Sequence, residues 1–217
     1  MDSDTAAGPL LVDRALPDLR FAHLECTAVD AGPSQAYRAA RSLDLLSIHS
    51  PLLELVTWAR GLPDRLRGTP VPQSASLRLA DLFDMVTGDQ QEQPWVGLGE
   101  NPGREMAFGA VGKIWQPSIE WRQVEPGDFS EFEEPGWAKV AAAVVFHPYG
   151  TRRSLVTYEA RTVCTDQVST RRFGHYRTLV SPGAGVVMRA TLQAVKTAAE
   201  HEATAGTGVR STAGDET

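Results

Sequence analysis

The sequence predicts an α+β domain in which a curved antiparallel β-sheet wraps around a long C-terminal helix. Three observations support this fold class: a hairpin of two long strands within 137–165, a series of strand-like segments before it, and a helical pattern over about 167–202. Strands linked by tight turns, with helices set apart from them, are typical of α+β folds. The chain has 217 residues, which suits one domain with tails.

The ends of the chain differ from its middle in composition. We expect a flexible N-terminal tail over residues 1–18, one folded domain over 19–202, and a disordered C-terminal tail over 203–217. The last segment consists mainly of small and polar residues. Such a segment buries too little apolar surface to order itself.

The first half of the domain reads as one strand followed by helices. The strand covers 21–31, and Ser34 is the expected N-cap of the helix that follows it. Apolar residues continue at helical spacing to about residue 61, with a break at Pro51. The segment 77–85 predicts one more short helix.

The second half reads as antiparallel strands. We predict strands at 95–99 and 104–116, joined by a turn, and a short strand within 119–124. The hairpin that follows consists of strands at 137–147 and 153–165.

Two glycines interrupt the strand at 104–116. Gly109 and Gly112 would weaken a strand unless it bends there or another group approaches closely. We expect a bend, which would let the sheet fold around the terminal helix. Asp166 is the expected cap of that helix, and Pro182 is predicted to kink it.

Composition excludes several classes of function. The net charge is −6 and no long basic run is present, which disfavours a nucleic-acid partner. No segment approaches the ~18 apolar residues of a membrane span, and the N-terminus lacks the order of a signal peptide. Two distant cysteines, Cys26 and Cys164, form neither a disulfide scaffold nor a metal knuckle. We expect a cytoplasmic protein without a metal or other cofactor.

Several segments resemble a known superfamily. They are DAGPSQAY at 30–37, PGREMAFGAVGKIWQP at 102–117, EEPGWAKVAAAVVFHP at 133–148 and TRRSL at 151–155. Over roughly residues 20–200 the chain is similar to bacterial members of the START-like, helix-grip (SRPBCC) superfamily. This superfamily includes polyketide cyclases/dehydrases and lipid-transport domains. The kink expected at Pro182 departs from the smooth terminal helix of that pattern.

The resemblance implies a cavity between the concave face of the sheet and the terminal helix, holding a hydrophobic small molecule. It also implies that the first and last strands are neighbours. The expected ligand-binding residues are apolar or aromatic side chains: Met106, Phe108, Ile114, Val144, Phe146, Val156, Tyr158, Phe173, Tyr176 and Val180. The alternative is that they fill a solid core, because apolar pockets and apolar cores look alike in sequence. Small neighbours such as Ala110, Ala142 and Ala160 favour an open space.

Polar residues on the first and last strands are the candidate catalytic groups. They are His23, Glu25, Tyr158, Glu159 and Arg161. If the charged ones share the concave face, they form a patch that could orient a polar ligand or transfer a proton. If they face outward, they form cross-strand ion pairs that contribute little.

The alternation of side chains along the first strand supports both arrangements. Leu24 and Cys26 make a good apolar inner face, which turns His23 and Glu25 outward. Val29, however, precedes the turn where the family's inward residue lies. Alternate residues of a strand share a face, so an inward Val29 would place His23 and Glu25 inward as well. The sequence favours the outward arrangement without deciding between the two.

Three functions remain open at this point. The first is binding of a hydrophobic or amphipathic small molecule, lipid-like or polyketide-like. The second is a cyclase/dehydratase-type enzyme that uses polar cavity residues for proton transfer. The third is a partner-binding domain with a vestigial cavity. The sequence leaves the oligomeric state open, with a dimer as one option.

Overall fold

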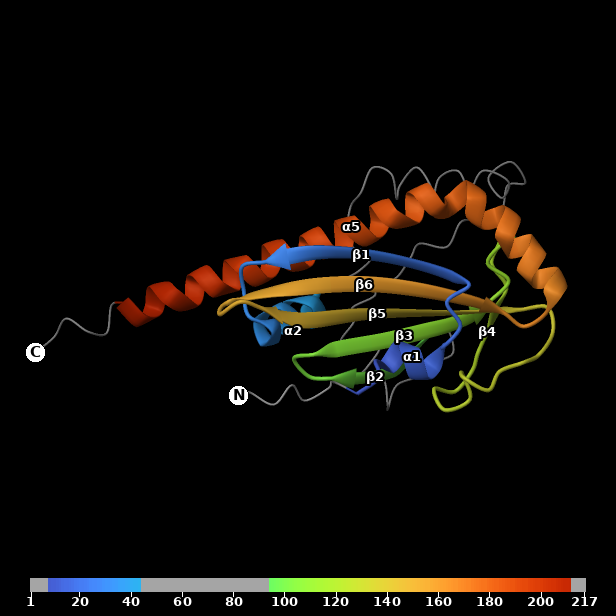
Figure 1. The fold of residues 1–217 in the computed structure, drawn as a ribbon, viewed down its shortest axis with the longest axis horizontal. Coiled ribbons are helices and arrows are strands. Elements are labelled where there is room, and N and C mark those ends of the chain that lie inside the picture. Colours follow the sequence, from blue (N-terminus) through green and yellow to red (C-terminus); the bar gives the residue numbers. More distant parts are fainter. Residues whose placement is uncertain (1–7, 44–93, 212–217) are drawn as a thin grey trace, which may run out of the picture.

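The computed structural model describes residues 8–43 and 94–211. This part of the chain forms a six-stranded antiparallel sheet and a long C-terminal helix, α5 (Gln167–Ser211), shown in Figure 1. The predicted α+β class, with its antiparallel sheet and terminal helix, is therefore confirmed. The helices expected between about residue 45 and residue 85 lie outside the described residues.

The sheet joins strands from both ends of the sequence. Its strands are β1 (Phe21–Val29), β2 (Trp95–Asn101), β3 (Glu105–Gly112), β4 (Trp121–Arg122), β5 (Ala138–Tyr149) and β6 (Arg153–Cys164). Their spatial order is β1-β6-β5-β3-β2, and β4 pairs with β3. The first and last strands are neighbours, as expected. β1 is consequently an edge strand, with only β6 beside it.

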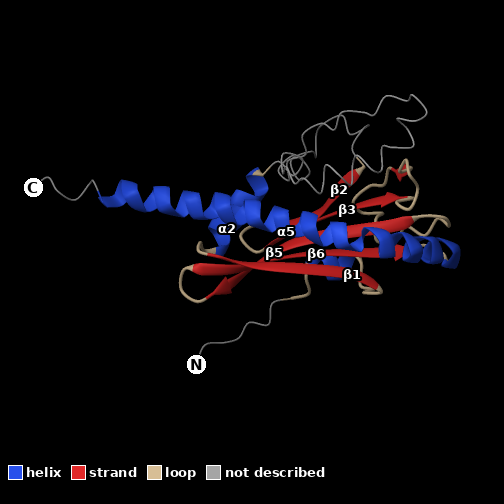
Figure 2. Cartoon of the chain, turned by 90° about the horizontal axis from the view of Figure 1, so that it is seen from above, coloured by secondary structure: helices blue, strands red, loops and turns tan. Residues whose placement is uncertain are grey.

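Two helices pack on one face of the sheet. Figure 2 shows α5 running along the strands, and α2 (Pro33–Ser42) packs against it. α2 and the second half of α5 share a core with β1, β3, β5 and β6, in which Val29, Phe146 and Leu192 are almost fully buried. We call this side of the sheet the helix face.

The start of α2 differs from the expected one. Gly32, not Ser34, is the N-cap of this helix. The helix begins earlier than expected because Pro33, with a fixed φ and no N–H, suits a first helical position.

A short helix packs on the opposite face. α1 (Leu11–Ala15) lies in front of the sheet in Figure 1, while α2 lies behind it. Leu11, Val12 and Leu16 are buried there against Val111 and Phe129. The expectation of a flexible tail over 1–18 is thus wrong for this stretch, because its apolar residues cover the second face of the sheet.

The structure explains Gly109 and Gly112 by close approach of aromatic rings. A Cβ on Gly109 would lie 2.8 Å from the ring of Phe129, and one on Gly112 would lie 2.6 Å from the ring of Trp121. Neither glycine has a positive φ. The two positions therefore make room for large side chains, whereas we had expected them to bend the strand.

α5 begins and bends as predicted but continues further. Asp166 accepts a hydrogen bond from the Ser169 backbone N–H at 2.8 Å, so it caps the first turn. Figure 1 shows the helix bending in its first half, which contains Pro182. The helix runs to Ser211 and so enters the expected disordered tail, 203–217. Extending an existing helix costs much less than starting one.

Candidate ligand-binding site

The pairing of β1 with β6 decides which candidate residues share a face. Directly opposed residues of antiparallel strands lie on the same side of a sheet. His23 is opposite Ala160 and Glu25 is opposite Tyr158, whereas Leu24 is opposite Glu159. His23, Glu25 and Tyr158 therefore share one face, and Glu159 lies on the other.

The shared charged patch that we considered does not exist. Arg161 is opposite Ala22, so it lies with Glu159 on the α1 side of the sheet. The physical reason is the register between the two strands. His23 and Glu25 lie opposite Ala160 and Tyr158, so the charged residues of β6 fall on the other face of the sheet.

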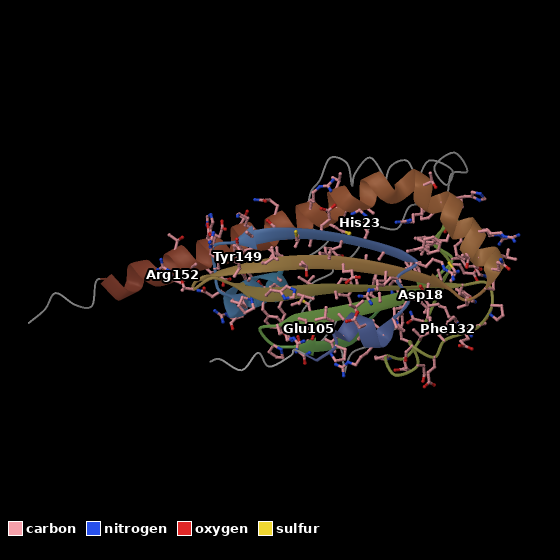
Figure 3. All side chains as sticks on the ribbon, viewed as in Figure 1. Asp18, His23, Glu105, Phe132, Tyr149 and Arg152 are labelled. Carbon is pink, nitrogen blue, oxygen red and sulfur yellow. The ribbon has the colours of Figure 1, made fainter. Side chains whose placement is uncertain are left out.

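The favoured outward arrangement of His23 and Glu25 is also wrong. Val29 is completely buried against α5, while Leu24 is 60% exposed. Figure 3 shows His23 on β1 close to α5. The residues that alternate with Val29, including His23 and Glu25, face the helix because α5 covers that side of β1. The side of β1 that carries Leu24 remains exposed.

His23 and Glu25 form a clasp with α5. His23 Nε2 lies 3.0 Å from Glu25 Oε1, and Arg189 Nη1 donates to the same oxygen at 2.5 Å. The hydrogen bond from His23, with a further contribution from Arg189, holds the pKa of Glu25 below its usual value. An ionised carboxylate only accepts hydrogen bonds, so Nε2 carries the imidazole proton and Nδ1 is the basic nitrogen.

Other side chains of α5 bind the backbone of β1 and its C-terminal end. Lys196 Nζ donates to Ala28 O at 2.7 Å, and Glu200 Oε1 accepts from Asp30 N at 2.9 Å. These contacts occupy backbone groups along an edge strand, which would otherwise be free to pair with another chain. The clasp thus belongs to a longer series of contacts that fixes α5 beside β1.

Glu159 and Arg161 have a structural environment on the other face. Arg161, only 5% exposed, donates to Glu159, to Asp13 at 2.7 Å and to Leu16 O at 3.0 Å. It therefore ties α1 to the sheet. We no longer regard Glu159 or Arg161 as a catalytic candidate, since neither reaches the helix face.

The predicted ligand-binding residues divide into groups. Five are buried in one cluster on the helix face: Met106, Phe108, Val144, Phe146 and Val156. Phe173 packs edge-on against Phe21 with ring centroids 5.0 Å apart, and Tyr176 adjoins it. Ile114 lies beyond the end of β3 and is half-buried. The side chain of Val180 lies outside the described part of the structure.

Tyr158 differs from its buried neighbours. It is surrounded by protein, and this burial raises its pKa to about 12, yet part of its surface remains accessible. Among the residues that the structure describes, its hydroxyl has no hydrogen-bond partner. Ala160 and Trp95, also at the border of the buried cluster, are likewise only half-buried. Tyr158 is therefore a polar side chain with accessible surface at the border of the apolar cluster.

Two residues of the clasp were missed by sequence reasoning. Gly185 lies so close to β1 that a Cβ there would be 3.0 Å from both Glu25 Oε1 and His23 Nε2. A glycine inside a helical pattern is a recognisable sign of close packing. Arg189 carried no comparable sign, because exposed arginines on helices are common.

The described residues offer no metal site and no long apolar helix. Within 8–43 and 94–211, no three His, Cys, Asp or Glu side chains come together to hold a metal ion. No helix in these ranges is long and apolar enough to cross a membrane. Both cysteines are free, and burial, together with the nearby Asp166 carboxylate, raises the pKa of Cys164 to about 11.

Comparisons with known proteins add little. No protein-family model matches the chain, and no curated protein matches it. The solved structure of TTHA0849 from Thermus thermophilus is similar over 82% of this chain and 96% of its own. The identity is 11% and the TM-score 0.31, so this similarity supports no conclusion about function.

Proposed function

We propose that this chain binds a hydrophobic or amphipathic small molecule, lipid-like or polyketide-like, between the helix face of the sheet and α5, in a helix-grip arrangement. Tyr158 is the observation that supports this most directly, because it is a half-buried polar side chain that packs against the apolar cluster of the helix face. The core beside it supplies an apolar wall that includes Phe108 and Val144.

The phenol of Tyr158 also suggests what the ligand carries. A ligand that fills the space beside this residue excludes water from its hydroxyl, and leaving a polar group buried without a partner costs about 1–3 kcal/mol. A ligand with one hydroxyl or carbonyl group near Tyr158 would avoid that cost. Ala142 and Ala160, which face each other on β5 and β6, leave room that larger side chains would fill.

The test begins with native mass spectrometry of the protein purified without ligand stripping, combined with displacement of an apolar dye. We expect co-purified lipid or aromatic compounds and saturable dye binding. Ala160→Leu should weaken dye binding at least tenfold, whereas Ala28→Leu, at an exposed position of β1, should not. The proposal fails if neither method detects uptake of any lipid or aromatic compound.

Tyr158→Phe tests the polar contact separately. We expect it to leave apolar dye binding unchanged and to weaken a hydroxylated ligand by roughly 2- to 12-fold, corresponding to a net hydrogen bond of about 0.5–1.5 kcal/mol. Equal binding of the hydroxylated ligand to both proteins would remove Tyr158 from the site.

A second candidate function is a cyclase/dehydratase-type enzyme. The observation in its favour is that Glu25 orients the imidazole of His23, leaving Nδ1 as a base on the face that also carries Tyr158. We would incubate the protein with the compound found by native mass spectrometry and look for loss of one water. His23→Gln should then retain binding but lose the product. Unchanged product formation would exclude this role.

A further inference from the structure

A hollow lies on the opposite face of the sheet, and none of its lining residues belongs to the apolar cluster of the helix face. Its volume is about 260 Å³, and its walls come from α1, β2 and the loop before β5. Ala15, Leu98 and Pro126 provide apolar surface, and the exposed side chains Arg14 and Ser130 also line it.

Buried charges hold the α1 wall of this hollow in place. Glu105, which is 0% exposed, accepts a hydrogen bond from the Leu11 backbone N–H at 2.9 Å. At the other end of α1, Arg161 donates to Leu16 O at 3.0 Å. Figure 3 shows Glu105 close to α1. Undocking α1 would leave two buried charges without these partners, so the wall is preformed.

The opposite wall is equally well fixed. Phe129 is 0% exposed because Gly109 lets its ring lie directly on β3. Ser130 O accepts a hydrogen bond of 2.7 Å from Lys139 Nζ, which is almost buried beneath the loop. This side of the hollow therefore has a defined shape.

The charge of the lining is positive. Arg14 is the one charged residue among those that line the hollow, and it makes no ion pair within the described ranges. Its neighbour Asp13 is already paired with Arg161 at 2.7 Å. The negative charge of Glu133 interacts with Lys139, which does not line the hollow. An exposed guanidinium beside an apolar hollow matches a carboxylate carried on an apolar body, since it binds carboxylates through two parallel hydrogen bonds.

We propose that this hollow binds a small amphipathic monocarboxylate, with its apolar body against Leu98 and Pro126 and its carboxylate at Arg14. The hollow is somewhat smaller than the roughly 300 Å³ at the lower end for drug-sized ligands, which favours a medium-chain or single-ring acid. This site is independent of the proposed interior site, and either can exist without the other.

The test uses octanoate as the probe and the full chain labelled at alanine and leucine methyl groups for NMR. We expect octanoate to shift the methyl signals of Ala15 and Leu98. Arg14→Gln should weaken this binding about tenfold, while Arg14→Lys should weaken it less, because lysine keeps the charge but not the two parallel hydrogen bonds. Octanol, which lacks the charge, should bind more weakly and be insensitive to Arg14→Gln.

Arg152→Gln is the matched control, because Arg152 is an exposed arginine at the β5–β6 turn, far from α1 in Figure 3. It should leave octanoate binding unchanged. Ala15→Leu narrows the hollow and should abolish the shift at Leu98. Equal effects of Arg14→Gln and Arg152→Gln, or unaltered binding in Ala15→Leu, would overturn the proposal. Octanoate shifts confined to Ala142 and Ala160 would also overturn it, while leaving the interior site supported.

Discussion

Gly185 of α5 lies directly against the imidazole of His23 on β1. A Cβ at position 185 would be 3.0 Å from His23 Nε2, closer than ordinary van der Waals contact. The missing side chain lets the helix approach the edge strand, and one turn later Arg189 reaches the carboxylate of Glu25. A side chain at 185 would therefore disturb the contact and the clasp together.

The first prediction compares two glycines of the same helix. Replacing glycine by alanine inside a helix usually stabilises a protein by about 0.5–1 kcal/mol. We expect this gain for Gly174→Ala, since nothing lies within 4 Å of a Cβ there. Gly185→Ala should be less stable than Gly174→Ala by about 1 kcal/mol, because His23 or the helix must shift.

Urea unfolding measures this difference. In a His23→Ala background, Gly185→Ala should recover most of the ordinary gain. Equal stabilisation by the two glycine substitutions in the wild-type background would show that Gly185 is not a required close contact.

The second prediction concerns Gly109. A methyl group there would be 2.8 Å from the ring of Phe129, which is 0% exposed and cannot easily move. We expect Gly109→Ala to lower the free energy of unfolding by about 1–3 kcal/mol, the usual range for overpacking. Phe129→Leu should reduce this penalty when the two are combined.

Gly127→Ala is the control for Gly109→Ala, since it lies in open space without a positive φ. Denaturant unfolding should place it within about 0.5 kcal/mol of the wild type, as for most surface changes. If both alanine variants have wild-type stability, Phe129 does not depend on the missing side chain at 109.

The third prediction tests whether Arg161 holds α1. Arg161→Leu leaves Leu16 O and the Glu159 carboxylate without their donor. Breaking a buried ion pair costs about 3–5 kcal/mol; here we expect about 2–3 because Asp13 is 42% exposed and partly screened. Trypsin should then cleave at Arg14 faster than in the wild type, since α1 undocks.

Arg122→Leu is the control for Arg161→Leu, because its ion pair with Glu134 is half exposed on both sides. It should change stability by less than about 1 kcal/mol, the upper end for surface ion pairs. Unaltered cleavage at Arg14 in Arg161→Leu would mean that α1 is held by apolar contacts alone.

The fourth prediction concerns pH and Asp166. Hydrogen bonds from Ser169, chiefly its backbone N–H, and from the Gly136 N–H lower the pKa of Asp166 to about 2. A lowered pKa in the folded state means that the charged carboxylate contributes stability above its usual pKa of 3.8. This contribution is lost as the pH falls from about 4 towards 2.

Asp166→Asn removes this titration while keeping a side chain that can cap a helix. Thermal unfolding measured at several pH values should show the largest difference between the two proteins above about pH 4, and a shrinking difference towards pH 2. A difference that stays constant over this range would contradict the assignment.

Much of the fold could be predicted because local sequence signals agreed with it. The turns after β2 and β5, the alternation within β5 and β6, and the capped start of α5 at Asp166 all appear in the structure. The segment before β1 was misjudged because a five-residue helix such as α1 has little pattern of its own. Its stability comes from Glu105 and Arg161, which are distant in sequence.

The sequence by itself determined where the strands lie, how their hairpins pair and that a long helix ends the domain, since these depend on turns and periodicity within short stretches. Only the tertiary structure decided that His23 and Glu25 face α5 and that Glu159 and Arg161 face α1. The physical reason is that either set of alternate residues along β1 could form its buried side. Its orientation is set by the register with β6 and by the helix that covers Val29.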